Sequence, residues 1–187
     1  MKSPMQYQAS ECDCAPATFI NALKYLLERS NIAPELIKKI YEYTLNRVDC
    51  RGTTREATEN LVNWLNIYFK ENNVKLECTR YTGEIVNTDL IKKELSENTV
   101  IILRLWSLYE HYVLVTKKDD NYLYLFDPYY DLKETYKSDS DIEVIYDNNN
   151  YNRIVSINRF DLLDIDEDKD YVLGELEKRE CIIMRRI

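Results

Sequence analysis

The sequence predicts a single α+β domain in which helices precede an antiparallel β-sheet. Apolar residues recur at helical spacing through the first part of the chain, whereas β-branched and aromatic runs separated by short polar breaks begin at Thr99. The 187 residues, 45% of them hydrophobic, suffice for one substantial core. We therefore expect one domain, mainly helical at residues 1–98 and mainly antiparallel β at residues 99–187, with the two halves around one cleft.

The helical half is predicted from apolar periodicity and from capping residues. Phe19 opens an apolar stripe at i, i+4, i+7 and i+8, with Asp13 as the expected N-cap and Pro16 in the first turn. Thr53-Thr54-Arg55-Glu56 has the pattern of a capping box. The expected elements are helices at residues 14–28, 34–47, 53–72 and 88–97 and a strand at residues 74–81.

The second half is predicted to be a set of short strands. The expected strands lie at residues 100–106, 111–118, 121–128, 142–146, 151–157 and 181–185. A hairpin turn at Asp119-Asp120 is expected to join the second and third of these. The polar runs 136–141 and 147–150 are interpreted as surface loops, and the acidic run 161–170 as a solvated loop.

Charge and hydropathy exclude several classes of partner. The net charge of −8 argues against nucleic acid and against an anionic membrane surface, both of which attract basic patches. The chain begins without an apolar segment of signal-peptide type, and its most apolar run, residues 100–106, is too short to span a bilayer. These features favour a cytoplasmic protein, in which the five cysteines are expected to be reduced.

Two residues have the properties of a nucleophile and its base. Cys14 is placed at the start of the first helix, where the positive end of the helix dipole favours a thiolate. His111 is the one histidine of the chain and opens a predicted strand. Asp127 follows the next strand, so a tight hairpin brings it near His111, where a carboxylate fixes the imidazole tautomer.

Gln8 is the candidate for stabilising an oxyanion. Its amide lies six residues before Cys14 and can join the Cys14 backbone N–H as a donor. Gln6 is a rival at a less suitable spacing.

These residues resemble a known family. The segment from Gln8 to Ala17, QASECDCAPA, resembles the Q-x5-C block of papain-like cysteine peptidases, and its Asp-Cys-Ala-Pro-Ala part is similar to the bacteriocin-processing, double-glycine leader peptidases. His111-Tyr112-Val113, Asp127-Pro128 and the Gly-Thr-Thr sequence at residues 52–54 resemble further blocks of that family, in the same order. The matches span about two-thirds of the chain.

The resemblance implies a papain-like fold and a role for each residue. Cys14 corresponds to the nucleophile, His111 to the general base and acid, Asp127 to the orienting carboxylate and Gln8 to the oxyanion donor. It implies hydrolysis of a peptide or isopeptide bond in a peptide or protein substrate, by a stand-alone domain without cofactor or metal. Glu110 replaces a glycine that is usual in the family, and its charge is expected to raise the pKa of His111.

Three other interpretations use the same residues. An acyltransferase would pass the Cys14 acyl group to an amine, and a non-catalytic relative would bind peptides without cleaving them. Zinc binding by Cys12, Cys14 and His111 is disfavoured because C-x-C lacks the usual two-residue spacer. The oligomeric state is left open.

Overall fold

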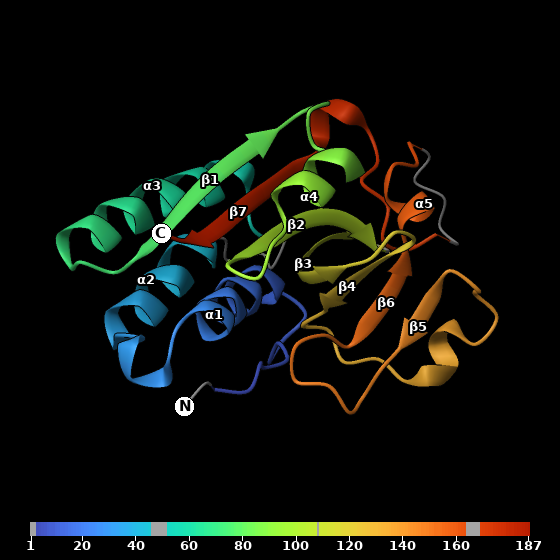
Figure 1. Ribbon diagram of the computed structural model, residues 1–187, viewed down its shortest axis with the longest axis horizontal. Helices are drawn as coiled ribbons and strands as arrows, with labels where there is room; N and C mark the ends of the chain where they lie inside the picture. Colours follow the sequence, from blue (N-terminus) through green and yellow to red (C-terminus); the bar gives the residue numbers. More distant parts are fainter. Residues whose placement is uncertain (1–2, 46–51, 108, 164–168) are drawn as a thin grey trace.

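A seven-stranded sheet organises the computed structural model, which describes residues 3–45, 52–107, 109–163 and 169–187 (Figure 1). Its order is β1-β7-β2-β3-β4-β6-β5, and every neighbouring pair is antiparallel. The strands are β1 (Leu76–Thr82), β2 (Thr99–Ser107), β3 (Tyr109–Lys118), β4 (Tyr122–Phe126), β5 (Ile142–Val144), β6 (Arg153–Ser156) and β7 (Glu180–Arg186). The α+β class and the predicted strands are confirmed.

The three N-terminal helices pack on one face of this sheet. They are α1 (Cys14–Leu26), α2 (Pro34–Thr44) and α3 (Arg55–Glu71). The stripe predicted from Phe19 is buried in the core beneath α1, where Leu23 and Leu26 are at most 1% exposed. Burial of this stripe therefore fixes α1, and with it Cys14, against the centre of the sheet.

The opposite face of the sheet carries a second core. It is covered by α4 (Thr88–Glu94), by α5 (Ile157–Phe160) and by residues of the long C-terminal connections. Ile101 and Leu103 of β2 point into this core, whereas Val100 and Ile102 point into the first. Apolar residues on both faces explain why β2 reads as an unbroken apolar run rather than an alternating one. Short 3-10 helices at η1 (Arg29–Asn31), η2 (Lys133–Tyr136) and η3 (Leu176–Lys178) complete the fold.

The start of α3 differs from the prediction by one residue. Thr54, not Thr53, is the N-cap, and its side chain accepts a hydrogen bond from the backbone N–H of Ala57 at 3.1 Å. The Thr53 hydroxyl instead donates to the carbonyl of Thr44 at 2.9 Å. Thr53 therefore ties α3 to the end of α2, a contact that the capping pattern could not reveal.

The acidic run at residues 161–170 is more firmly held than predicted. Asp161 accepts hydrogen bonds from Thr88 at the start of α4, and Asp170 accepts one from Ser107 at 2.9 Å. Residues 161–163 form an exposed loop, as expected, but the carboxylates of Asp161 and Asp170 also satisfy donors on neighbouring elements. Residues 164–168, and residues 46–51 at the end of the predicted second helix and in its connection, lie outside the described residues.

The described residues contain neither a candidate membrane-spanning helix nor a candidate metal cluster. No helix there combines the length and apolar character needed to cross a bilayer. No group of three or more histidine, cysteine, aspartate or glutamate side chains gathers there in a way that suits a metal ion.

Candidate active site

Cys14 is the first residue of α1 and is 6% exposed. Asp13 is the N-cap residue, as predicted, but its side chain makes no capping hydrogen bond. The buried Asp13 carboxylate instead accepts hydrogen bonds from the backbone N–H groups of Ala9 at 3.0 Å and Ser10 at 2.7 Å. The loop before the nucleophile candidate is thus held through its own N–H groups, and the Asp13 side chain leaves the first N–H groups of α1 uncapped.

His111 lies between Asp127 and Cys14. Its Nε2 is 2.7 Å from Oδ1 of Asp127, at the open end of the predicted β3–β4 hairpin. The Cys14 thiol lies close enough to the imidazole to contribute to raising its pKa. Because Asp127 occupies Nε2, Nδ1 is the ring nitrogen left for the thiol. The structure therefore brings together the three residues that the sequence placed 16 and about 100 positions apart.

The electrostatics of this contact favour a charged imidazole. Burial by itself lowers the pKa of His111, but the charge and hydrogen bond of Asp127, with a contribution from Cys14, raise it to about 10. For Asp127, burial alone would raise the pKa. The charge and hydrogen bond of the neighbouring His111 have the opposite and larger effect, so the pKa of Asp127 is lowered. A proton that moves from the thiol to His111 is therefore accepted by a base whose charged form Asp127 stabilises.

Gln8 lies in the loop beside Cys14 and is attached to the strand end that carries Asp127. Its backbone N–H donates to the carbonyl of Pro128 at 2.8 Å, and its Nε2 donates to the carbonyl of Ser10 at 2.8 Å. Its Oε1 is buried and has no hydrogen-bond partner within the part of the chain that the structure describes. One amide hydrogen of Nε2 is engaged by Ser10, which leaves the second for another acceptor.

Gln6, the rival of Gln8, is committed elsewhere. Its side-chain oxygen accepts a hydrogen bond from Nζ of Lys24 at 2.7 Å, and its backbone is bonded to the side chain of Asn21. These contacts hold Gln6 against α1.

Glu110 does not act on His111 as expected from the sequence. Its carboxylate forms an ion pair with Arg104 at 2.5 Å, and Arg104 is 8% exposed. The charge of Glu110 is thus balanced by Arg104 of β2. The groups that raise the pKa of His111 are Asp127 and Cys14.

The other cysteines differ from Cys14. Cys78 and Cys181 carry free thiols, and burial raises the pKa of both, that of Cys181 to about 12. Cys12 is disulfide-bonded, contrary to the expectation of reduced thiols, because pairing depends on proximity in the fold and not on the cysteine count. Cys50 lies outside the described residues.

Sequence reasoning missed three residues around Asp127. Asn152 exchanges hydrogen bonds with its backbone at 2.7 and 2.8 Å, and the Tyr171 hydroxyl donates to Oδ2 at 2.7 Å. Arg153 donates in turn to the Tyr171 oxygen at 3.1 Å. An arginine in an otherwise strand-like run at residues 151–157 was the one signal in the sequence, since a buried guanidinium needs a polar partner.

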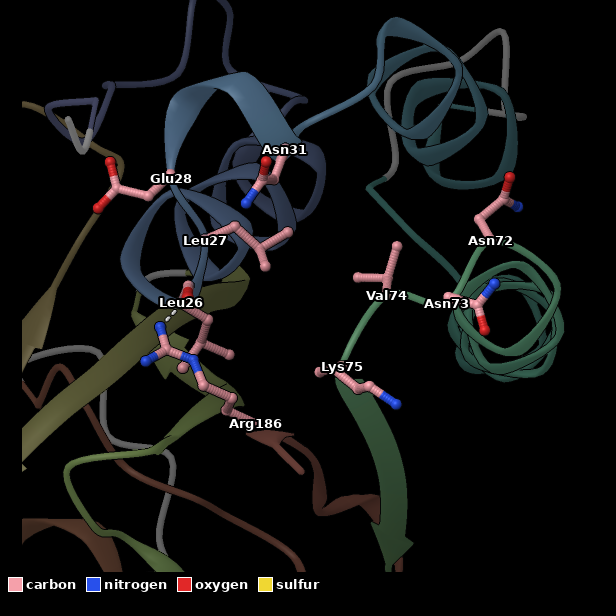
Figure 2. A pocket seen from close by; sticks show the side chains of 9 residues that line it. All are labelled: Leu26, Leu27, Glu28, Asn31, Asn72, Asn73, Val74, Lys75 and Arg186. Carbon is pink, nitrogen blue, oxygen red and sulfur yellow. Dashed lines mark hydrogen bonds between the residues drawn. The ribbon is translucent and has the colours of Figure 1, made fainter.

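A pocket of about 670 Å³ lies far from this site (Figure 2). It is lined by Leu26 and Leu27 at the end of α1, by Asn72 and Val74 after α3, and by Arg186 of β7, among others. Leu26 and Cys14 are at opposite ends of α1, about 18 Å apart at 1.5 Å per residue. This pocket is therefore separate from the Cys14 chemistry.

Comparison with known proteins identifies the fold. No family model matches the chain, and neither does any curated protein. The peptidase domain of Streptococcus ComA, a bifunctional ABC transporter involved in quorum sensing, matches with a TM-score of 0.51 at 16% sequence identity, over 98% of each chain. A double-glycine motif protease from an AMS/PCAT transporter, solved with the leader peptide, has a TM-score of 0.48 at 15% identity and covers 100% of this chain and 93% of its own. The chain thus has the fold of the ComA peptidase domain.

Proposed function

We propose that the protein is a cysteine peptidase that hydrolyses a peptide or isopeptide bond through an acyl-enzyme on Cys14. The observation that carries this proposal is the contact of His111 with Asp127, in which Nε2 lies 2.7 Å from Oδ1, together with Cys14 at the start of α1, which lies close enough to the imidazole to raise its pKa. An activated thiol, a base and a group that orients the base are what nucleophilic catalysis by cysteine requires.

The reaction follows from this arrangement. His111 takes the thiol proton, and the Cys14 sulfur attacks the substrate carbonyl to give a tetrahedral oxyanion. The backbone N–H of Cys14 and the free amide hydrogen of Gln8 donate to that oxygen. His111 returns the proton to the leaving amine as the C–N bond breaks, and a water molecule activated by His111 then hydrolyses the thioester. Asp127 keeps the imidazole oriented in both halves of the reaction.

The fold supports a peptide as the substrate. The motif resemblance and the fold shared with the ComA peptidase domain both favour a peptide or protein chain bound between the start of α1 and the β3–β4 hairpin. We infer that the substrate is an extended segment, because the scissile carbonyl must reach a thiol that is only 6% exposed.

Selective alkylation of Cys14 tests the proposal. Iodoacetamide at neutral pH should modify Cys14 faster than Cys78 and Cys181, whose buried thiols have raised pKa values, and mass spectrometry of the digested protein resolves the three sites. Turnover of a peptide library should disappear in Cys14→Ser and persist in the control Cys181→Ala. Added amines distinguish hydrolysis from acyl transfer. Equal labelling of the three thiols, or turnover that survives Cys14→Ser, contradicts the proposal.

A further inference from the structure

Asp127 is hydrogen-bonded, through the carboxylate oxygen that His111 does not contact, to a buried tyrosine–arginine pair. The Tyr171 hydroxyl donates to Oδ2 of Asp127 at 2.7 Å, and Nε of Arg153 donates to the Tyr171 oxygen at 3.1 Å. His111 takes the other carboxylate oxygen, Oδ1, at 2.7 Å. Each oxygen of Asp127 thus has its own side-chain partner.

Arg153 is unusually buried for a charged residue. It is 1% exposed, and its direct carboxylate neighbour, Asp131, is 3.5 Å away. Its other contacts are neutral, namely the carbonyls of Asn152 at 3.0 Å and Tyr129 at 3.3 Å, and the Tyr171 hydroxyl. A guanidinium removed from water requires compensating negative charge. Asp131 supplies part of this charge directly, and the Asp127 carboxylate on the far side of the tyrosine hydroxyl adds to it.

The backbone at Tyr171 is held in an unfavourable conformation. Its φ is +63°, in the left-handed region that residues with a Cβ avoid. The next residue, Val172, forms a two-hydrogen-bond bridge with Trp106 at 2.8 and 3.3 Å, and Asp170 accepts from Ser107 at 2.9 Å. The end of β2 therefore fixes both sides of Tyr171. Strained residues that the surroundings over-determine are typical of functional sites.

We propose that Tyr171 and Arg153 are positioning residues that keep Asp127 ionised and oriented toward His111. This inference rests on the proposed cysteine peptidase function, because it assigns them a role in preparing the same base. Neither residue touches the Cys14 sulfur or the bond to be cleaved. Tyr171 donates to the carboxylate, and Arg153 polarises the tyrosine hydroxyl and contributes its positive charge.

The surroundings of Asp127 act on its pKa in opposing directions. Those that interact with it are His111 of β3, Arg153 of β6, Tyr136 of η2, Asp131 and Tyr171. Burial raises the pKa of Asp127, whereas the charges of His111 and Arg153 and the hydrogen bond of Tyr171 lower it. Removing the tyrosine hydroxyl should therefore raise the pKa of Asp127.

The single histidine of the chain provides a direct readout. In an NMR titration of the His111 ring, protonation of Asp127 should appear as a separate low-pH inflection of the His111 resonances. Tyr171→Phe should move this inflection to higher pH by about one unit, as expected for loss of one hydrogen bond to a carboxylate. Arg153→Lys, which retains the charge but not the guanidinium geometry, should move it in the same direction by a smaller amount.

Tyr136→Phe is the matched control. Tyr136 is a buried tyrosine whose ring centroid is 6.0 Å from that of Tyr171, but its hydroxyl donates to Asp170 at 3.0 Å. Its substitution removes a hydroxyl from the same cluster and should leave the inflection unchanged. An inflection that is absent in the wild type, or that moves equally in Tyr171→Phe and Tyr136→Phe, overturns the proposal.

The titration needs no substrate, so it separates this inference from the proposed function. If Tyr171→Phe shifts the inflection but the wild type does not cleave peptides, the positioning role of Tyr171 and Arg153 stands and the proposed peptidase function is rejected. In an active enzyme, Tyr171→Phe should also move the acidic limb of the kcat/KM profile to higher pH, because Asp127 then loses its charge at a higher pH. Turnover with an unchanged acidic limb and an unchanged inflection would reject the positioning pair alone.

Discussion

Asp127 lies on the same side of the β3–β4 hairpin as His111 because β3 is bulged at Thr116, where the register of the two strands shifts by one residue. Continued past the end of β4, the shifted register sets Asp127 opposite Val113, which shares its side-chain direction with His111. Without the bulge, Asp127 would lie opposite Leu114 and point to the other face. The catalytic contact that we propose therefore depends on one extra residue in a strand.

The His111–Asp127 contact should make stability depend on pH. The pKa of His111 is raised from 6.5 to about 10 in the folded protein. A group with a raised folded pKa stabilises the fold below its unfolded pKa, and this contribution is lost as the pH rises through the folded value. We expect the free energy of unfolding, measured in urea, to fall between about pH 6.5 and pH 10 because of His111.

Asp127→Asn is the variant that isolates this effect. It preserves the size of the side chain but removes the charge that raises the pKa of His111, so the loss of stability between about pH 6.5 and pH 10 should be smaller. Other groups titrate in this range in both proteins and cancel in the difference. Parallel stability profiles for the wild type and Asp127→Asn would show that the pair is not coupled.

The elements of this fold were predictable where one face of a segment is buried. The stripe from Phe19 predicted α1, and the β-branched and aromatic runs on either side of the polar break at Asp119-Asp120 predicted the hairpin that carries His111. The bulge at Thr116 was not predictable, because a threonine in a β-branched run fits a regular strand equally well. Sequence therefore predicted the proximity of His111 and Asp127 but not the register that causes it.

The residues of the candidate site also fall into two groups: those predictable from a local sequence pattern, and those placed by contacts between distant parts of the chain. Gln8, Cys14, His111 and Asp127 lie in short local patterns, which a single sequence displays. Tyr171 follows an acidic run and contacts Asp127 across 44 positions of the chain. Its left-handed backbone is imposed by the bridge to β2 and not by its own neighbours, so no local pattern indicates it.

Gln8 should be distinguishable from Gln6 by mutation. Gln8→Ala removes the proposed side-chain donor to the oxyanion and should lower kcat by about 10²–10³-fold with a small change in KM. Its effect on the free energy of unfolding should stay within about 1 kcal/mol, since the amide it removes donates to a single carbonyl, that of Ser10.

Gln6→Ala is the control for this prediction. Gln6 bonds Lys24 and Asn21, so its loss should affect stability slightly and leave kcat near the wild-type value. Steady-state kinetics on a peptide substrate measures both variants. Equal losses of kcat in the two variants would remove Gln8 from the oxyanion site.

Glu180 is the centre of a buried network beside the candidate site. It is 0% exposed, and its carboxylate accepts hydrogen bonds from Thr58 at 2.7 Å, Arg80 at 2.5 Å and the Tyr112 hydroxyl at 3.0 Å. Tyr112 directly follows His111 in β3, and its backbone carbonyl accepts from Thr18 of α1 at 2.9 Å. This network joins α1, α3 and the sheet at the level of the candidate site.

Glu180→Ala should destabilise the protein by about 3–5 kcal/mol, because it leaves the Arg80 charge without its buried partner. Glu59→Ala is the matched control: Glu59 pairs with the same arginine at 3.3 Å, but its side chain is 59% exposed, so its loss should cost about 0–1 kcal/mol. Urea unfolding of both variants measures the difference. The double variant Glu180→Ala/Tyr112→Phe should lose less stability than the sum of the losses in the two single variants. Both changes remove the same hydrogen bond, the one between the Tyr112 hydroxyl and Glu180. Similar costs for Glu180→Ala and Glu59→Ala would show that the burial of Glu180 adds nothing to the strength of the pair.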